Sequence, residues 1–445
     1  MDVRSICIVQ SICYSNYYAQ FAKMPKYVAM MKNRAYNNFN LSLYWKVHCM
    51  KELSRLAGEV RASTTLAVDS LAKQMQADGL DVIGFGTGEP DFDTPDNIKE
   101  AAIKAINAGK TKYTPAAGLV ELRKAIAARL KIDLNFDYDF NQITVASGAK
   151  HSVFIALMAI LNPGDEVILP APYWVSYYEM IRMAGGVPVI VEAGEDQDFK
   201  ISAEQLENAM SPKTKALMLN NPSNPTGMLY TRSELEALAE ICKKYDLYVI
   251  ADEIYFSLVY DDREFVSFAS ISDDSYERTI LINGVSKSYA MTGWRIGYAA
   301  ASHKISKVMA NYLSHSTGAP GTMNQIAAVE ALSGPQDGIE AMRKVFEVRR
   351  NYIVKRINEI PGVSCIVPDG AFYVMMNIKK LIGKTLGGKL IENDDDFAVA
   401  FLEKGRVAVV PCSGFGAPGF VRWTYAASME NIREGLNRLE KLLEA

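Results

Sequence analysis

The sequence predicts an α/β protein whose core is an open, mostly parallel β-sheet covered by helices on both faces. From Asp96 onward, short apolar runs typical of buried strands alternate with longer segments in which apolar residues recur at helical spacing. The runs are apolar almost throughout, as expected for strands that are buried on both faces of a parallel sheet. After Pro335 this alternation changes, which predicts a second, smaller α+β domain.

The expected elements follow one another in a regular order, and Asn162-Pro163-Gly164 is a clear stop signal. The expected helices of the large domain include Asn97–Ala108, Gly118–Lys131, His151–Leu161 and Arg232–Lys244. Its expected strands are Ile143–Val145, Glu166–Leu169, Val187–Val191, Ala216–Leu219, Leu247–Ala251, Thr279–Ile282 and Ile296–Ala300. A long charged helix is expected after Pro335, followed by strands at Val363–Val367, Ala371–Met376, Val407–Val410 and Val421–Tyr425.

Composition excludes several classes of partner. The apolar fraction is 49% and the formal net charge is −3, which indicates a globular chain with ample core and gives no reason to expect nucleic acid or a membrane surface as partner. No apolar stretch approaches the length of a spanning helix, so a cytoplasmic protein is expected. The six cysteines lack metal-ligand spacing, so free thiols and no metal site are expected.

Residues 1–49 differ in character from the rest of the chain. They are rich in Tyr, Met and Asn, show little periodicity, and lack the basic start and apolar core of a secretory signal. An amphipathic pattern begins at Met50. We therefore expect an irregular leader outside the fold, with Met50 as the natural start.

Polar residues follow several of the predicted strands, where ligands bind in open α/β sheets. Ser147-Gly148-Ala149-Lys150 ends a strand and opens a helix, an arrangement that can bind a phosphate, although such turns are also common without a ligand. Trp174 offers a flat face, or is simply core. Asn224 lies between prolines, which fixes its donor amide, unless the segment only makes a turn.

Asp252 and Lys287 carry the sharpest signals. Asp252 ends an apolar strand, and a buried carboxylate is costly unless it faces a cation or a protonatable nitrogen, with a structural salt bridge as the alternative. Lys287 lies between two apolar runs, Thr279–Asn283 and Ile296–Ala300. Burial favours the neutral amine, the form that condenses with an aldehyde.

Together these motifs resemble the fold type I, class I aminotransferases that use pyridoxal 5'-phosphate, and among them the bacterial-type aspartate aminotransferases. The resemblance runs from about Met50 to the C-terminus. The motifs that carry it stand in family order: Gly86 to Phe92, Lys112 to Gly118, Asn221 to Gly227, Asp252 to Tyr255, Lys287 to Arg295, and Arg422 to Ala426. The resemblance implies a homodimer with shared active sites, a large cofactor domain of residues 98–330 and a small domain formed by 50–97 and 331–445.

The resemblance also implies a role for each matching residue. Lys287 would form a Schiff base with the cofactor and later move the substrate proton, and Asp252 would hold the pyridine nitrogen protonated. Asn224 and Tyr255 would donate to the phenolic oxygen of the ring, and Trp174 would stack on it. The phosphate would be bound by Gly148, Ala149, Ser286 and Arg295, with Tyr113 contributed by the neighbouring subunit, and Lys150 would also be among the cofactor-binding residues.

For the substrate, the resemblance implies that Arg422 clamps the α-carboxylate, with Gly88 beside it. Trp174 and Asn224 would border the same site. Lys150 would take the distal carboxylate, and Arg61 could add a second cation. Family members commonly carry lysine where this chain has Arg61, so prephenate or aromatic activity stays open. A solvated side chain is the alternative for both cations.

The expected reaction is therefore transfer of the amino group of L-aspartate, or a similar amino acid, to 2-oxoglutarate by a ping-pong mechanism. An aromatic, alanine or prephenate aminotransferase, or a carbon-sulfur lyase, on the same fold is the nearer alternative. A ligand-sensing regulator domain is an alternative from a different class of protein. Such regulators carry a helix-turn-helix ahead of the fold, for which residues 1–49 are too short and irregular.

Overall fold

The computed structural model describes residues 53–61 and 64–444. The expected leader and the expected start at Met50 lie outside these residues. The short helix α4 (Arg55–Glu59) belongs to an N-terminal unit that ends at Glu59, and the chain from Val60 onward forms a second unit. The helices from α5 onward and all the strands belong to this second unit.

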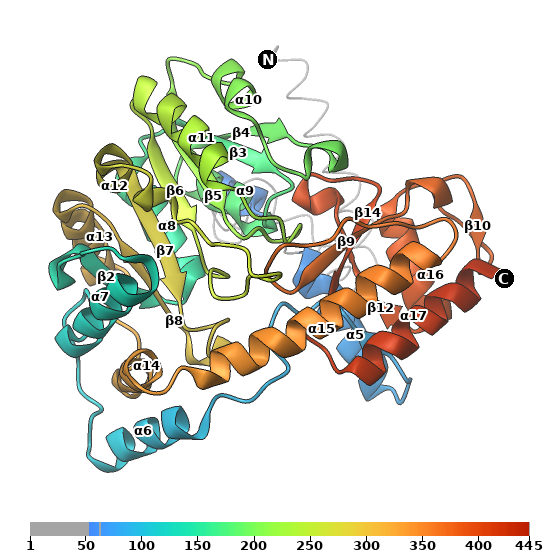
Figure 1. The fold of residues 1–445 in the computed structure, drawn as a ribbon, viewed down its shortest axis with the longest axis horizontal. Coiled ribbons are helices and arrows are strands. Elements are labelled where there is room, and N and C mark those ends of the chain that lie inside the picture. Colours follow the sequence, from blue (N-terminus) through green and yellow to red (C-terminus); the bar gives the residue numbers. More distant parts are fainter. Residues whose placement is uncertain (1–52, 62–63, 445) are drawn as a thin grey trace, which may run out of the picture. The chain divides into compact units, whose positions relative to one another are not determined.

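A seven-stranded sheet forms the centre of this unit, in the order β2-β8-β7-β6-β5-β3-β4 (Figure 1). β8 runs antiparallel to both of its neighbours, and the other pairings are parallel, as expected from the sequence. The strands are β2 (Ile143–Ser147), β3 (Glu166–Ala171), β4 (Val187–Glu192), β5 (Thr214–Asn220), β6 (Tyr248–Asp252), β7 (Thr279–Gly284) and β8 (Ile296–Ala300).

Helices cover both faces of this sheet because successive side chains of each strand point to opposite sides. In β6, Ile250 packs in the cluster that contains α8 (Ala149–Ile160), α9 (Val175–Met183) and α13 (His303–His315). Its neighbours Val249 and Ala251 pack instead against α11 (Arg232–Lys244). The remaining helices around the sheet are α6 (Asp96–Asn107), α7 (Val120–Leu134), α10 (Ala203–Asn208), α12 (Asp273–Arg278) and α14 (Thr322–Ser333).

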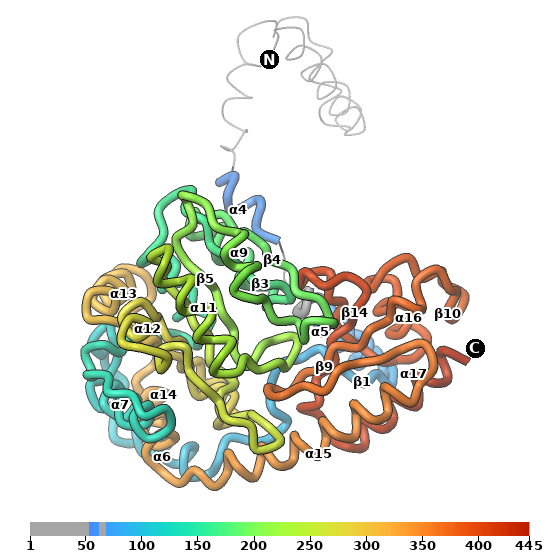
Figure 2. The backbone as a smooth tube through the Cα atoms, turned by 45° about the horizontal axis from the view of Figure 1, so that its top comes forward, coloured from blue at the N-terminus to red at the C-terminus, as the bar shows by residue number. Residues whose placement is uncertain are grey.

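The C-terminal part of the chain builds smaller sheets and incorporates an N-terminal segment. β1 (Ile83–Gly84) pairs in parallel with β12 (Val407–Ala408), and Figure 2 shows β1 among the C-terminal elements. A three-stranded sheet has the order β13-β14-β9. The other elements are β9 (Tyr373–Asn377), β10 (Thr385–Leu386), β11 (Lys389–Leu390), β13 (Val410–Pro411), β14 (Phe420–Thr424), α5 (Thr64–Ala77), α15 (Asp337–Glu359), α16 (Asp394–Gly405) and α17 (Met429–Glu444). The exact division at residues 97 and 331 stays a prediction.

Two expected strands differ in the structure. Val363–Val367 is not a strand, and only Ser364 bridges to Asn377. The side chain of Asn358 takes both backbone groups of Cys365, accepting from its N–H at 2.9 Å and donating to its C=O at 3.1 Å, so neither is free for a ladder. Val407–Val410 is two short strands, because the chain changes partner from β1 to β14 at Val409.

None of the helices in the described part of the chain is long and apolar enough to cross a membrane. Among the described cysteines, Cys242, Cys365 and Cys412 are free and buried. Burial raises the pKa of each of these thiols, to about 12 for Cys242 and Cys365, which keeps them protonated and unreactive.

Candidate active site

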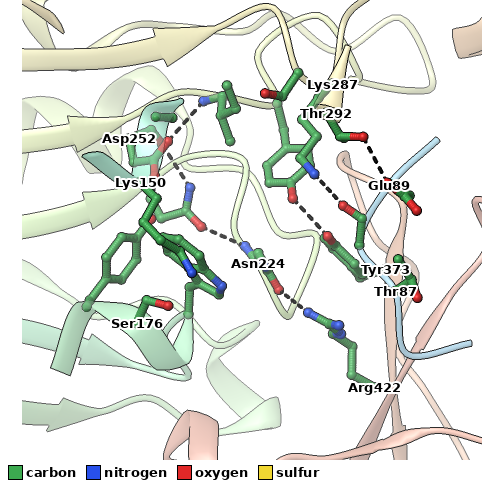
Figure 3. A pocket seen from close by; sticks show the side chains of 18 of the residues that line it. Thr87, Glu89, Lys150, Ser176, Asn224, Asp252, Lys287, Thr292, Tyr373 and Arg422 are labelled. Carbon is green, nitrogen blue, oxygen red and sulfur yellow. Dashed lines mark hydrogen bonds between the residues drawn. The ribbon is translucent and has the colours of Figure 1, made fainter. Parts of the chain in front are cut away.

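A cavity of about 340 Å³ lies where the carboxyl ends of the parallel strands meet. Asp252 is the last residue of β6, and the loops after β2, β3, β5 and β7 supply further side chains (Figure 3). The cavity is lined by eleven of the residues predicted from the sequence: Gly88, Ala149, Lys150, Trp174, Asn224, Asp252, Tyr255, Ser286, Lys287, Arg295 and Arg422. Residues far apart in sequence therefore converge on one site.

Lys287 follows β7 and points into the cavity. Its Nζ donates a hydrogen bond to the carbonyl oxygen of Gly88 and lies 5.9 Å from the ring centroid of Tyr255. Burial lowers the pKa of the amine to about 8. The charges of Arg422 and Arg295 act in the same direction, and that of Glu89 opposes them. A usable fraction of the neutral amine is therefore present near neutral pH.

Asp252 lies opposite and is only 3% exposed. The hydroxyl of Tyr177 donates to its Oδ2 at 2.7 Å, and the backbone N–H of Ile254 donates to its Oδ1 at 3.2 Å. Burial raises the pKa of this carboxyl to about 6 despite these hydrogen bonds. A buried acid of this kind is stabilised by a protonated nitrogen placed in the cavity.

Gly148 and Ala149 open α8 and form a cradle with Arg295. Gly148 has φ +82°, and a Cβ added there would collide with the Arg295 guanidinium, so only glycine fits. Arg295 is held by hydrogen bonds to the carbonyl oxygens of Thr292 at 2.9 Å and Ser147 at 3.4 Å. A helix N-terminus beside an arginine fits a phosphate group.

Arg422 lies on β14 and is 2% exposed. Its guanidinium donates to the side-chain oxygen of Asn224 at 2.8 Å and to the carbonyl oxygen of Gly86 at 2.7 Å, whereas its buried Nε has no partner. It lies 4.4 Å above the ring of Tyr373. A guanidinium that lines a cavity can bind a carboxylate there.

Lys150 and Trp174 border the cavity together. The Nζ of Lys150 lies 4.9 Å from the Trp174 ring centroid. Burial and the charge of Arg295 lower the pKa of Lys150. Arg61 is farther out, with its guanidinium 6.0 Å from the ring of Tyr178.

Three predicted residues do not line the cavity: Arg61, Gly148 and Tyr113. Gly148 lies behind Ala149, against Arg295. The side chain of Tyr113 is fully exposed. Within the described residues, Tyr113 thus makes no part of the cavity.

The sequence interpretation missed Tyr177, Tyr373 and Glu89. Tyr177 lies three positions after Trp174, on the same side of α9, so helical spacing could have identified it. Glu89 accepts a hydrogen bond from Thr292 at 2.8 Å and belongs to a motif already noticed. The local sequence around Tyr373 did not indicate a role in the site, because its hydrogen-bond partner Tyr255 is 118 positions away.

The fold and the site together define an enzyme that binds a phosphorylated aldehyde cofactor between a lysine and a buried acid. Comparison with known proteins identifies the family. The family model described as aminotransferase class I and II matches residues 80–439. The chain belongs to this family, whose members of the aspartate aminotransferase type use pyridoxal 5'-phosphate.

Individual relatives cover almost the whole matched region. An aspartate aminotransferase of Bacillus subtilis is 48% identical over 88% of this chain and 99% of its own length. A probable aspartate/prephenate aminotransferase of Rhizobium leguminosarum is also 48% identical, over 89% of this chain and all of its own. Among solved structures, the aspartate aminotransferase of Rhizobium meliloti is similar with a TM-score of 0.85 at 40% identity, covering 89% and 99% of the two chains. That of Thermus thermophilus with maleate has a TM-score of 0.83 at 40% identity, covering 88% of this chain and all of its own.

Proposed function

We propose that this aminotransferase transfers the amino group of L-aspartate to 2-oxoglutarate, which yields oxaloacetate and L-glutamate. One observation carries the proposal: two cations, Arg422 and Lys150, border the cavity that contains Lys287. A substrate with two carboxylates needs such a pair. Relatives named aspartate aminotransferase support the choice of donor.

The residues fit the cofactor. Asp252 would hold the ring nitrogen protonated, Tyr255 and Asn224 would contact the phenolic oxygen, and Trp174 would cover the ring. The phosphate would be held by Gly148, Ala149, Ser286 and Arg295, with Lys150 beside them. When bound, the cofactor supplies a ring that withdraws electrons from the substrate Cα.

Lys287 is the residue that would hold and move the proton. Because its pKa is lowered, Lys287 would be available as a neutral base for the proton of the substrate Cα. The keto acid then leaves and 2-oxoglutarate enters the same site, which is the basis of a ping-pong order.

Substrate orientation follows from the two cations. The guanidinium of Arg422 would bind the α-carboxylate, and Lys150 would bind the distal carboxylate. The Thermus relative was solved with maleate, a dicarboxylate, which supports a dicarboxylic substrate here. Gly88 borders the same site and allows the hydroxyl of Tyr373 to approach, since a Cβ at Gly88 would collide with that hydroxyl.

Prephenate is a second acceptor to test, because relatives at 48% identity are named aspartate/prephenate aminotransferases. Arg61 is the residue on which this acceptor would depend. Transamination of alanine or aromatic donors and carbon-sulfur lyase activity compete with the proposed reaction on the same fold, and a screen of donors separates them from it.

We also propose a cytoplasmic homodimer with shared sites. The fully exposed ring of Tyr113 would complete the phosphate site of the neighbouring subunit. Light scattering gives the mass of the holoenzyme in solution, and cell fractionation gives its location. A monomer with full activity would contradict the shared site.

The deciding experiment is a single-turnover screen of the holoenzyme with individual amino donors, followed through the cofactor absorbance. Aspartate and glutamate should convert the bound cofactor much faster than alanine or phenylalanine, because only they engage both cations. Each acceptor, including prephenate, is then tested for the reverse conversion. Conversion by alanine as fast as by aspartate would count against the proposed substrate.

A further inference from the structure

Tyr373 is a buried residue of the cavity that touches three parts of the site. It lies on β9, next to β14, which carries Arg422. Its hydroxyl is 2.9 Å from that of Tyr255, its ring lies 4.4 Å below the Arg422 guanidinium, and its hydroxyl fills the space above Gly88 (Figure 3).

Either hydroxyl could be the donor in the hydrogen bond between Tyr255 and Tyr373, but only one direction is possible when Tyr255 donates its own proton to the cofactor. Burial raises the pKa of Tyr255 well above its ordinary value and also raises that of Tyr373, so both keep their protons. A phenol has one proton to donate. If Tyr255 donates its proton to the phenolic oxygen of the cofactor, the proton in the 2.9 Å bond must come from Tyr373.

A hydroxyl group that accepts a hydrogen bond becomes a stronger hydrogen-bond donor itself. Tyr373 polarises the hydroxyl of Tyr255, which makes Tyr255 a better donor and stabilises negative charge on the oxygen that it faces. The edge-to-face packing of the two rings, with centroids 5.8 Å apart, fixes the pair.

The ring of Tyr373 acts on the other side of the site. Its face lies under Arg422, and Phe415 is 5.2 Å from the same guanidinium. A guanidinium held over an aromatic face is oriented and stabilised without losing a donor to a carboxylate. The aromatic ring and the hydroxyl of Tyr373 therefore have separable tasks.

Resting on the proposed function, we propose that Tyr373 is a positioning residue that acts in two ways: its hydroxyl donates to Tyr255, and its ring orients Arg422 for the substrate carboxylate. The residue thus joins cofactor tuning and carboxylate binding in one side chain.

The first test uses the holoenzyme without substrate. The absorbance of the bound cofactor is titrated with pH in the wild type, Tyr373→Phe, Tyr255→Phe and the double variant. Loss of the hydroxyl should move the midpoint of Tyr373→Phe upward by a few tenths of a pH unit, roughly the size of a cooperative hydrogen-bond effect. The double variant should match Tyr255→Phe, because Tyr373 acts through Tyr255.

The second test separates the ring from the hydroxyl. Tyr373→Phe should keep the KM for aspartate within about twofold, whereas Tyr373→Leu should raise it roughly five- to tenfold, the range expected for one lost cation–aromatic contact. If Tyr373→Leu does not fold, Tyr373→Phe and the titration still decide the hydroxyl half.

Several outcomes overturn the proposal. An unchanged midpoint in Tyr373→Phe, alongside a shifted midpoint in Tyr255→Phe, removes the hydroxyl role. Additive shifts in the double variant show that Tyr373 does not act through Tyr255. Equal KM values for the Phe and Leu variants remove the ring role. Failure of the proposed substrate would appear differently, as a wild type that titrates normally but does not turn over aspartate.

Discussion

The guanidinium of Arg422 donates a 2.8 Å hydrogen bond to the side-chain oxygen of Asn224, across 198 positions of sequence. The bond links β14 to the loop after β5, and so connects the residue proposed for the substrate carboxylate with one proposed for the cofactor. Both are buried. An arriving carboxylate would therefore meet a guanidinium that is already oriented by two hydrogen bonds.

Replacement of Arg422 should lower kcat/KM to a similar extent for every amino-acid substrate. Arg422→Ala removes a buried bidentate partner and leaves Asn224 unpaired, so kcat/KM should fall by about a hundredfold or more for aspartate and for glutamate. Arg422→Lys should recover only part of the lost kcat/KM, because the lysine ammonium group lacks the planar guanidinium geometry that binds both oxygens of a carboxylate. Steady-state kinetics with both donors checks this. A loss confined to one donor would contradict the assignment to the shared α-carboxylate.

Replacement of Lys150 should be selective. Lys150→Ala should lower kcat/KM for aspartate by at least about tenfold more than for alanine, because only aspartate has a distal carboxylate to lose its partner. Lys150 lies beside the phosphate cradle, so cofactor affinity is measured first and the assays are run at saturation. Equal losses for the two donors would place Lys150 with the cofactor alone.

Uptake of the cofactor should depend on pH through Lys287. With its pKa lowered to about 8, the reactive neutral amine increases with pH up to that value and then levels off. The rate at which apo-protein binds pyridoxal phosphate covalently should rise about tenfold per pH unit below pH 7.5 and flatten above 8.5. Stopped-flow absorbance measures it, with Lys287→Ala as the variant that forms no covalent adduct. A rate still rising tenfold per unit at pH 9.5 would mean an amine with its ordinary pKa.

Asp252 should make the apo-protein lose stability as pH rises. Its pKa is raised from 3.8 to about 6 by burial, so the folded state binds more protons than the unfolded state between these values. This contribution is fully present below pH 3.8 and is lost as pH rises through about 6. Relative to Asp252→Asn, the free energy of unfolding of the wild-type apo-protein should fall by up to about 3 kcal/mol across that window. Denaturant titrations at both ends of the window measure it, and parallel curves for the two proteins would refute it.

Gly297 should be required for the phosphate cradle. A Cβ at this position of β8 would collide with the backbone nitrogen of Ala149, and backbone cannot move aside as a side chain can. Gly297→Ala should therefore weaken cofactor binding by about tenfold or more, through a displaced N–H at the start of α8. Gly293→Ala is the matched control, because an added Cβ there meets nothing within 4 Å. Equal cofactor affinities for the two variants would show that the backbone at Ala149 can shift without weakening the phosphate site.

Much of the fold could be predicted because its signals are local. The expected helix Arg232–Lys244 has the observed bounds, since a capping box at Thr231 and an amphipathic face mark it in the sequence. The strands of the central sheet are all present, because most of these runs are buried on both faces and apolar; the edge strand β4, with Val187 and Ile190 exposed, is the exception to this burial. The prediction of a strand at Val363–Val367 was wrong, because a side chain seven positions before Cys365 took its backbone groups.

By itself the sequence determined which chemical groups the site contains: a lysine and an acid at the ends of apolar strands, a glycine turn for an anion and an arginine within a strand. Tertiary structure alone decided how they are tuned. The partners of Asp252, Arg422 and Tyr255 come from distant segments, as in the bonds to Tyr177, Asn224 and Tyr373. The pKa values of about 6 and about 8 arise from desolvation, which depends on what the whole chain packs around a group and on nothing in its local sequence.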